Sequence, residues 1–161
     1  MIRPALISDL PAIRRLFRDT ILAINIRDYT EQQVAGWAAN WRNEERWNER
    51  LVCDYFIVAE RNNTITGFAA LEANGHFKFL FVHKDYQRQG IATELVEAIE
   101  LHARKIGLET LDSNVSITAR PFMEKHGYTF MKKQETAYPE GVYINFRMEK
   151  PIFAGNFTMT I

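Results

Sequence analysis

The stretch that decides the fold is FLFVHKDYQRQGIAT, residues 79–93. It begins with apolar residues typical of a strand, continues into a polar loop and leads directly into a long amphipathic helix. Such a junction points unpaired backbone N–H groups the same way, and the helix dipole adds partial positive charge. Gly90 removes a side chain where phosphate oxygens must approach the backbone, and Arg88 can add a charge-assisted contact. The stretch therefore predicts an anion-binding loop.

Two other phosphate loops fit this stretch less well. The nucleotide P-loop needs two glycines followed by Lys and Ser or Thr, and the dinucleotide fingerprint needs three glycines. Residues 79–93 contain a single glycine. The chain also has no histidine pair or acidic cluster with the spacing of metal ligands, so we expect no metal.

Apolar spacing on either side of the stretch predicts a mixed α/β chain. Helices are expected over residues 10–24, from residue 30 to about 41, and over 90–106 and 119–126, with 42–50 left open between helix and loop. Strands are expected over residues 55–59, 64–71, 76–82, 110–115, 128–134 and 142–148. No linker or repeat divides the chain, so we expect one domain over residues 1–150 and a tail over 151–161.

Composition excludes several classes of function. The 161 residues include 20 basic and 20 acidic side chains, so no global charge favours nucleic acid or a membrane surface. The single cysteine, Cys53, allows no intrachain disulfide. No signal-peptide core or membrane-length apolar stretch is present. We therefore expect a cytoplasmic protein that meets small molecules or other proteins.

The anion loop resembles the acetyl-CoA motif of the GNAT superfamily, Gln/Arg-x-x-Gly-x-Gly/Ala, here filled by Gln87, Gly90 and Ala92. Four further segments resemble the family in the same order: the opening at residues 2–5, the hairpin with residues 65–68, a late helix at 119–128 and a closing strand at 145–150. The resemblance covers nearly the whole chain. It implies the GNAT fold, a single central, mixed but mostly antiparallel sheet flanked by helices, with a splayed strand pair that holds acetyl-CoA.

The resemblance also implies an activity. The chain is expected to be an N-acetyltransferase that moves the acetyl group of acetyl-CoA to a primary amine, favouring a small molecule, by direct attack in a ternary complex. Coenzyme A is then the product. Two alternatives stay open: a catalytically silent acetyl-CoA sensor or interaction module, and an acetyltransferase of protein N-termini or lysines. A homodimer is considered as an assembly.

Family membership implies roles for named positions on the cofactor side. The backbone of Leu80, Phe81 and Val82 should run beside the pantetheine arm, and an N–H near Phe81 or Val82 should stabilise the oxyanion. The pyrophosphate should be held by the amides of Gln87, Arg88, Gln89, Gly90, Ile91, Ala92 and Thr93. The opposite side should be lined by Asn114, Ser116 and Phe122.

The acid and the base depart from the family pattern. The late-helix position that often carries a tyrosine acid is Met123, and a thioether donates no proton. Tyr86 and Tyr128 are candidate replacements, unless the thiolate leaves unprotonated. His76 stands where several members carry a glutamate base, and histidine can accept a proton at neutral pH. Glu72 is a second candidate base.

The acceptor side should lie in the N-terminal helices, which vary within the family. Asp28, Tyr29 and Trp37 place polar and aromatic groups near the loop between the first two helices. They are expected to form a slot for a flat or aliphatic amine. Packing of Trp37 on the sheet is an equally acceptable interpretation.

Overall fold

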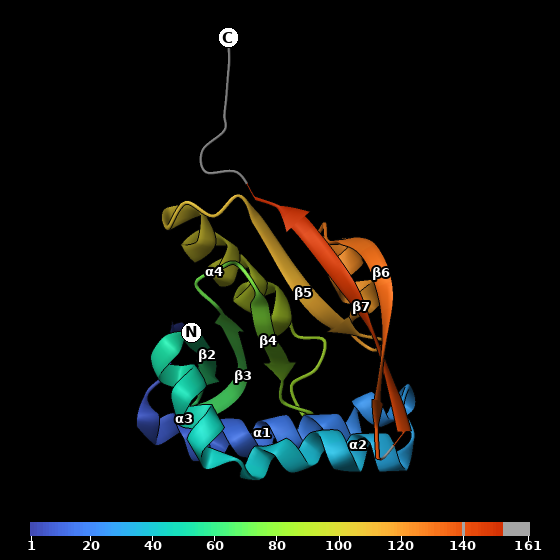
Figure 1. Cartoon of the computed structure of the whole chain (residues 1–161). Helices are drawn as coiled ribbons and strands as arrows, with labels where there is room; N and C mark the ends of the chain where they lie inside the picture. The colour runs from blue at the N-terminus through green and yellow to red at the C-terminus, as the bar shows by residue number, and fades with distance from the viewer. Residues whose placement is uncertain (140, 153–161) are drawn as a thin grey trace.

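The strands form two sheets, and the helices pack against them (Figure 1). The computed structural model describes residues 1–139 and 141–152. The strands are β1 (Ile2–Pro4), β2 (Tyr55–Arg61), β3 (Thr64–Leu71), β4 (Phe77–Val82), β5 (Thr110–Ser116), β6 (Thr129–Tyr138) and β7 (Gly141–Pro151). The α-helices are α1 (Leu10–Ala23), α2 (Glu31–Ala38), α3 (Glu44–Cys53), α4 (Ile91–Lys105) and α5 (Arg120–Lys125).

The first sheet has the strand order β1-β2-β3-β4, with every neighbouring pair antiparallel. Both of its faces are covered. On β2, Phe56 and Val58 join the core cluster of α1, α2 and α3, whereas Ile57 and Ala59 join that of α4. Successive side chains of a strand point to opposite faces. Coverage of both faces therefore explains why β2 and β3 read as nearly continuous apolar runs.

The N-terminal helices form one layer on this sheet, as Figure 1 shows. The capping box expected from the sequence starts α2, where Thr30 Oγ1 accepts from the Gln33 N–H and the Gln33 side chain accepts from the Thr30 N–H. The open stretch at 42–50 belongs mostly to α3. Its buried apolar residue is Trp47. The Trp47 ring stacks on Phe79 with centroids 5.1 Å apart and meets Phe17 edge-on at 5.0 Å.

The long helix α4 covers the other face of the first sheet at close range. Its inward residues Leu95 and Ile99 are fully buried. Gly67 of β3 permits this approach, because a Cβ there would lie 3.0 Å from both Ile91 Cγ2 and Leu95 Cδ1. The packing fixes where the N-terminus of α4 sits relative to the end of β4.

The second sheet has the order β5-β7-β6, again with antiparallel neighbours. It meets the first sheet through a parallel bridge between His76 and Asp112, reinforced by the Ser113 hydroxyl, which donates to Phe77 O at 2.9 Å. The register between β3 and β4 shifts at Ala70/Leu71, which leaves Lys78 as an extra, bulged residue. A bulge bends its strand, so β4 turns away from β5 beyond this point (Figure 1).

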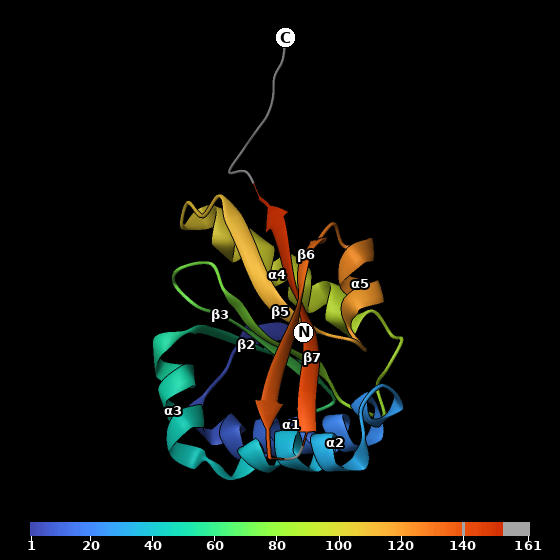
Figure 2. The same ribbon diagram turned by 45° about the vertical axis from the view of Figure 1, so that its right-hand side comes forward.

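The expected mixed, mostly antiparallel sheet flanked by helices is therefore confirmed, with its hydrogen bonding interrupted between β4 and β5. The β6–β7 hairpin crosses in front of β5 and reaches α2 (Figure 2). There the Gln33 side chain donates to Val142 O, and the Tyr143 hydroxyl donates to Gln33 O. This hairpin closes one side of the space that opens between the two sheets.

The strands of the hairpin are longer than the apolar pattern predicts. They extend to Tyr138 and Pro151. Nearly all of β6 is exposed, so apolar alternation does not mark its full length. Ile152 is buried, and its N–H donates to Glu109 O at 2.8 Å. Of the tail expected over 151–161, residues 153–161 lie outside the described residues. None of the described helices is long and apolar enough to cross a bilayer.

Candidate active site

The edge of β4 that faces β5 carries backbone groups without strand partners. The His83 N–H donates to Thr66 O at 2.8 Å, so this residue faces β3. Backbone groups alternate along an antiparallel ladder, and Phe81 therefore also turns its N–H toward β3. Leu80 and Val82 turn theirs toward the gap. The N–H expected at Phe81 or Val82 is consequently offered by Val82 and Leu80, and not by Phe81.

The loop that follows β4 is held by side chains at its two ends. Val82 O accepts from Gln87 Nε2 at 2.8 Å and from the buried Thr20 hydroxyl of α1 at 3.0 Å. Arg61 Nη1 donates to Gln89 Oε1 at 3.0 Å. The side chains of Gln87 and Gln89 therefore shape the loop, and Gln89 does not line the cleft. Arg61 was missed by the sequence analysis, since nothing in its local pattern reports a contact with this loop.

The loop itself presents free backbone donors. None of the N–H groups from Gln87 to Thr93 has a hydrogen-bond acceptor among the described residues, and the first bond of the helix runs from Glu94 N to Gly90 O. Arg88 and Gly90 have φ angles of 60° and 82°. Left-handed residues within such a turn make a concave nest of N–H groups that binds anions. A Cβ at Gly90 would meet no protein atom within 4 Å, so the space above the loop is open.

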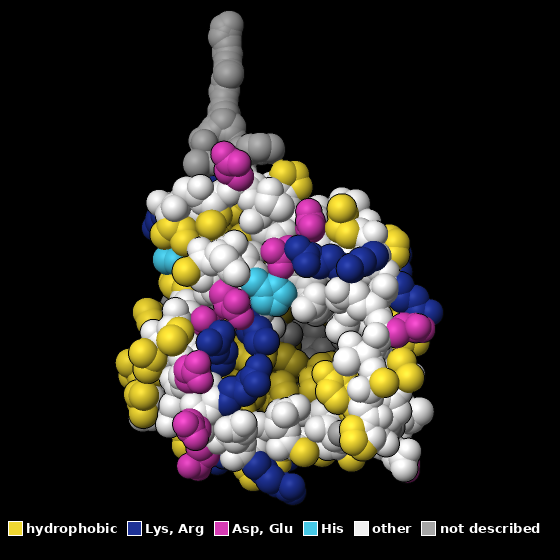
Figure 3. Space-filling view, viewed as in Figure 1, with side chains coloured by type: hydrophobic (Ala, Val, Ile, Leu, Met, Phe, Trp, Pro, Cys, Tyr) yellow, Lys and Arg dark blue, Asp and Glu magenta, His cyan; other side chains and the backbone are white. Residues whose placement is uncertain are grey.

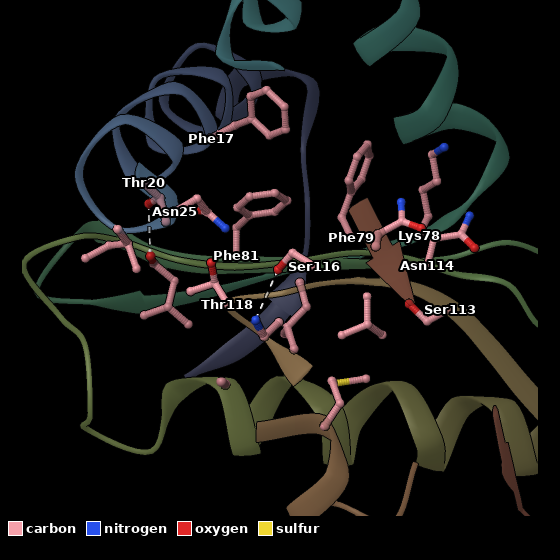
Figure 4. Close-up of a pocket in the computed structure, with 18 of the residues that line it drawn as sticks. Phe17, Thr20, Asn25, Lys78, Phe79, Phe81, Ser113, Asn114, Ser116 and Thr118 are labelled. Carbon is pink, nitrogen blue, oxygen red and sulfur yellow. Dashed lines mark hydrogen bonds between the residues drawn. The ribbon is translucent and has the colours of Figure 1, made fainter. Parts of the chain in front are cut away.

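A cleft of about 1120 Å³ runs between the two sheets. Figure 3 shows it as a hollow with hydrophobic side chains inside and Lys and Arg side chains beside it. Figure 4 shows Phe17, Thr20 and Asn25 reaching in from the N-terminal helices, and Phe79 and Phe81 rising from β4. Of the expected cofactor residues, those that line the cleft are Leu80, Phe81, Val82, Gln87, Arg88, Gly90, Ile91, Ala92, Thr93, Asn114, Ser116 and Phe122.

The wall across from β4 is built by β5 and α5. Asn114 Oδ1 accepts from Gln134 Nε2 at 3.0 Å, so the amide of Asn114 is oriented by the β6–β7 hairpin. Ser116 Oγ accepts from the Ala119 N–H at 3.1 Å and acts as a local cap before α5. Phe122 lies on α5 beside these groups and adds an apolar surface. The structure thus brings the three residues to one wall.

The strand edge, the anion nest and the cleft between them suit an extended ligand that carries a phosphate group. Comparison with known proteins identifies the enzyme family. The model of the acetyltransferase (GNAT) domain matches residues 25–150. The chain belongs to the GNAT acetyltransferase family. The N-acetyltransferase YafP of Escherichia coli K12, whose own function is uncharacterized, is 32% identical over 120 residues, covering 74% of this chain and 75% of YafP.

Solved GNAT structures agree with the fold. A GCN5-related N-acetyltransferase from Rhodopseudomonas palustris superposes with a TM-score of 0.90 at 28% identity, covering 94% of each chain. PaiA N-acetyltransferase from Thermoplasma acidophilum, solved with coenzyme A, gives 0.77 at 21% identity, over 94% of this chain and 98% of PaiA. Salmonella typhimurium yncA, solved with acetyl-CoA, superposes with a TM-score of 0.65 at 16% identity, covering 100% of this chain and 97% of yncA. The expectation of an N-acetyltransferase is confirmed, and the last two comparisons support the fold alone.

The two candidate bases lie in different surroundings. His76 lines the cleft, and its Nδ1 is 2.5 Å from Asp112 Oδ1, which fixes the imidazole against β5. Asp112 is also 3.5 Å from Arg147. Glu72 does not line this cleft, and its carboxylate forms an ion pair with Arg50 at 3.2 Å. The structure therefore brings His76 to the cleft and leaves Glu72 outside it.

The two tyrosines considered as acids also lie in different surroundings. Tyr86 lines the cleft. Tyr128 is buried away from it, and its hydroxyl donates to Glu100 Oε2 at 2.9 Å. Burial, together with the charge of Glu100, raises the pKa of Tyr128 far above its usual value. Met123 occupies the position expected for the acid, where it is buried and lines the cleft.

On the acceptor side, Tyr29 and Trp37 line the cleft, with ring centroids 5.6 Å apart. The Tyr29 hydroxyl donates to Ile144 O at 2.7 Å and accepts from the Ile117 N–H at 3.0 Å. Burial raises the pKa of Tyr29, and its two hydrogen bonds connect the turn between α1 and α2 to β7 and to the residue after β5. Asp28 is exposed and does not line the cleft. It is therefore not brought together with the other two.

Several lining residues were missed from the sequence. Phe17, Thr20 and Asn25 come from α1 and the turn after it, and Lys78 comes from the bulge in β4. The signal for Thr20 was available, since a polar residue on the buried face of an amphipathic helix needs a partner. No local pattern marks Lys78, because the bulge exists only in the pairing of β3 with β4.

Proposed function

We propose that the chain transfers the acetyl group of acetyl-CoA to a primary amine of a small molecule by direct attack in a ternary complex. The observation that carries this proposal is the set of free N–H groups from Gln87 to Thr93, placed at one end of the unpaired edge of β4. A pyrophosphate needs such donors and an open approach, and Gly90 leaves that approach free. Acetyl-CoA supplies an activated thioester when bound.

The pantetheine arm of the cofactor can pair with the free edge of β4 as an additional strand would. Leu80 and Val82 have N–H groups directed at the gap, and the Leu80 carbonyl faces the same way. Val82 O already accepts hydrogen bonds from Thr20 and Gln87. The groups that can bond to the amides of the pantetheine arm are therefore the N–H and carbonyl of Leu80 and the N–H of Val82. An N–H at this edge can stabilise negative charge that develops on the thioester oxygen. Of the two, Leu80 lies nearer the bulge and the acceptor side.

His76 is the proposed base, oriented by Asp112. Hydrogen bonding of Nδ1 to the carboxylate leaves Nε2 to accept a proton. His76 precedes Leu80 by four residues, which is about 13 Å along an extended strand. The proton therefore travels through water in the cleft and not by direct contact.

The departing thiol has two routes, protonation by an acid in the cleft or release as a thiolate. Met123 supplies no proton at the usual position, and Tyr128 lies outside the cleft, so Tyr86 remains as the candidate acid. A thiol of this kind has a pKa near that of cysteine, about 8.5, so release as a thiolate is chemically acceptable. The buried Met123 is also the observation that favours the alternative function, an acetyl-CoA sensor that does not turn over.

A small acceptor is favoured over a protein. The β6–β7 hairpin is bonded to α2 through Gln33, Val142 and Tyr143, which closes one side of the cleft. A free amine on a small molecule passes such an opening more easily than a folded chain does. Acetylation of protein N-termini or lysines remains the alternative within the same chemistry.

The test is release of coenzyme A thiol from acetyl-CoA in the presence of small amines, with acetyl-CoA binding measured separately by calorimetry. Amine-dependent thiol release supports the proposal. Binding without release by any amine, while peptides with free N-termini or lysines also give none, indicates the sensor. Release with peptides alone indicates the protein acetyltransferase.

A further inference from the structure

The charged Lys, Arg, Asp and Glu side chains that line the cleft, among the described residues, are all cationic. Among the described residues that line it, the Lys and Arg side chains are Arg46, Arg50, Lys78 and Arg88, and none is Asp or Glu. Figure 3 shows Lys and Arg side chains gathered on one side of the hollow. A site for a polyamine or another polycation would present the opposite charge. The charge of this wall instead suits a ligand that carries an anionic group.

Of these four cations, only Arg50 forms an ion pair with another residue that the structure describes. Arg50 is engaged by Glu72 at 3.2 Å and by Asp54 at 3.5 Å, and both carboxylates lie outside the cleft lining. Arg88 belongs to the anion loop, which leaves Arg46 and Lys78 for a ligand elsewhere in the cleft. The charge of Lys78 acts on Asp54 without an ion-pair contact, so its ammonium can still bind a ligand in the cleft.

The position of Lys78 separates it from the cofactor's phosphates. Lys78 is the bulged residue of β4, whereas the anion nest follows the other end of that strand. Figure 4 shows Lys78 at the opposite end of the cleft from Thr20, whose hydroxyl binds Val82 O beside the nest. The Leu80 N–H is two residues from Lys78, about 7 Å along the strand. An acceptor whose anionic group binds Lys78 can therefore place an amine a few bonds away at the thioester.

The floor beside these cations is aromatic. Phe79 stacks with Trp47 at 5.1 Å, and Phe17 lies 5.1 Å from Phe81 across the space shown in Figure 4. All four rings line the same cleft as these cations. Aromatic surface of this kind accepts an apolar or flat body.

We infer that the acceptor is an amine that carries an anionic group on an apolar body, as an aromatic amino acid does, and that Lys78 and Arg46 bind the anionic group. The inference rests on the proposed acetyl transfer for the fate of the amine. It adds the chemical class of the acceptor and the two side chains that select it.

Matched acceptors test the inference in the thiol-release assay. We use L-phenylalanine against 2-phenylethylamine and L-leucine against 3-methylbutylamine, pairs that differ only in the carboxylate. The acid of each pair should have a KM at least about tenfold lower, since a hydrogen bond to a charged group contributes about one factor of ten or more. Lys78→Gln should remove that advantage and leave the KM of the neutral amine and of acetyl-CoA unchanged. Arg42→Gln is the control, because Arg42 is exposed and does not line the cleft.

A second measurement keeps the inference separate from the proposed function. Calorimetry with 3-phenylpropionate, which has no amine, measures the anion site alone in the protein loaded with coenzyme A. Binding that weakens at least about tenfold in Lys78→Gln supports the inference even if no amine releases thiol, in which case acetyl transfer fails. Equal KM values within each pair, or 3-phenylpropionate that binds no better to the wild type than to Lys78→Gln, overturn the inference and leave acetyl transfer standing.

Discussion

Gly90 and Gly107 provide a matched pair for testing the anion loop. They lie just before and just after helix α4, with φ angles of 82° and 83°, and a Cβ at either would meet no protein atom within 4 Å. Alanine at each should therefore cost about the same folding energy, roughly 1–2 kcal/mol for a left-handed residue with a Cβ. For a chain of this size that corresponds to a fall in Tm of about 2–8 °C.

Only one of the two glycines belongs to the cleft. Gly90 lines it, whereas Gly107 does not. In Gly90→Ala the new methyl group stands where the pyrophosphate must approach the N–H groups of the loop. Loss of one charge-assisted hydrogen bond of about 1.5–3 kcal/mol should weaken acetyl-CoA binding by about 10- to 100-fold. Gly107→Ala should bind acetyl-CoA as the wild type does.

Calorimetry of acetyl-CoA binding, together with thermal unfolding without ligand, measures both quantities. The expected result is a similar Tm in the two variants and a large difference in Kd. A wild-type Kd for Gly90→Ala would refute the assignment of the loop to the pyrophosphate. An equal loss of affinity in Gly107→Ala would show that the effect passes through the stability of α4 and not through contact with the ligand.

Three further predictions concern packing, pH and catalysis. Gly67→Ala should destabilise the fold by about 1–3 kcal/mol in denaturant unfolding, because its Cβ would lie 3.0 Å from Ile91 and Leu95. Hydrogen bonds from Arg3 lower the pKa of Asp9, so its stabilisation should be present above about pH 4 and lost as the pH falls further, and Asp9→Asn should lack that part of the acid dependence of unfolding. If His76 is the base, His76→Gln should lose about 10²–10⁴ in kcat/KM and the rise of kcat/KM with pH, and a wild-type pH profile would assign it to structure.

Much of the fold could be predicted because the apolar pattern is local. The helix at α1 and the strands β2, β3 and β4 follow directly from the spacing of apolar residues, and the Thr30–Gln33 capping box marks the start of α2. The cofactor loop is equally local, since a glycine between a strand and a helix determines its own backbone. These features need no knowledge of distant residues.

The candidate catalytic and acceptor residues could be predicted only in part. His76 and Tyr86 reach the cleft, whereas Tyr128 turns to Glu100 and Glu72 turns to Arg50. Sequence spacing places a residue on a strand or helix, but the direction of its side chain depends on partners that are far away along the chain. The expected roles of those that do reach the cleft remain proposals.

The sequence by itself determined the family, the order of elements and the anion loop, because each depends on residues within about one element of each other. Tertiary structure decided which edge groups of β4 are free, since the bulge at Lys78 exists only through the register between β3 and β4. It also decided the charge of the cleft. A chain with equal numbers of acidic and basic residues still has only cations among the described Lys, Arg, Asp and Glu side chains of this cleft. The fold places Glu72 and Asp54 outside the lining, where they pair with the cleft residue Arg50.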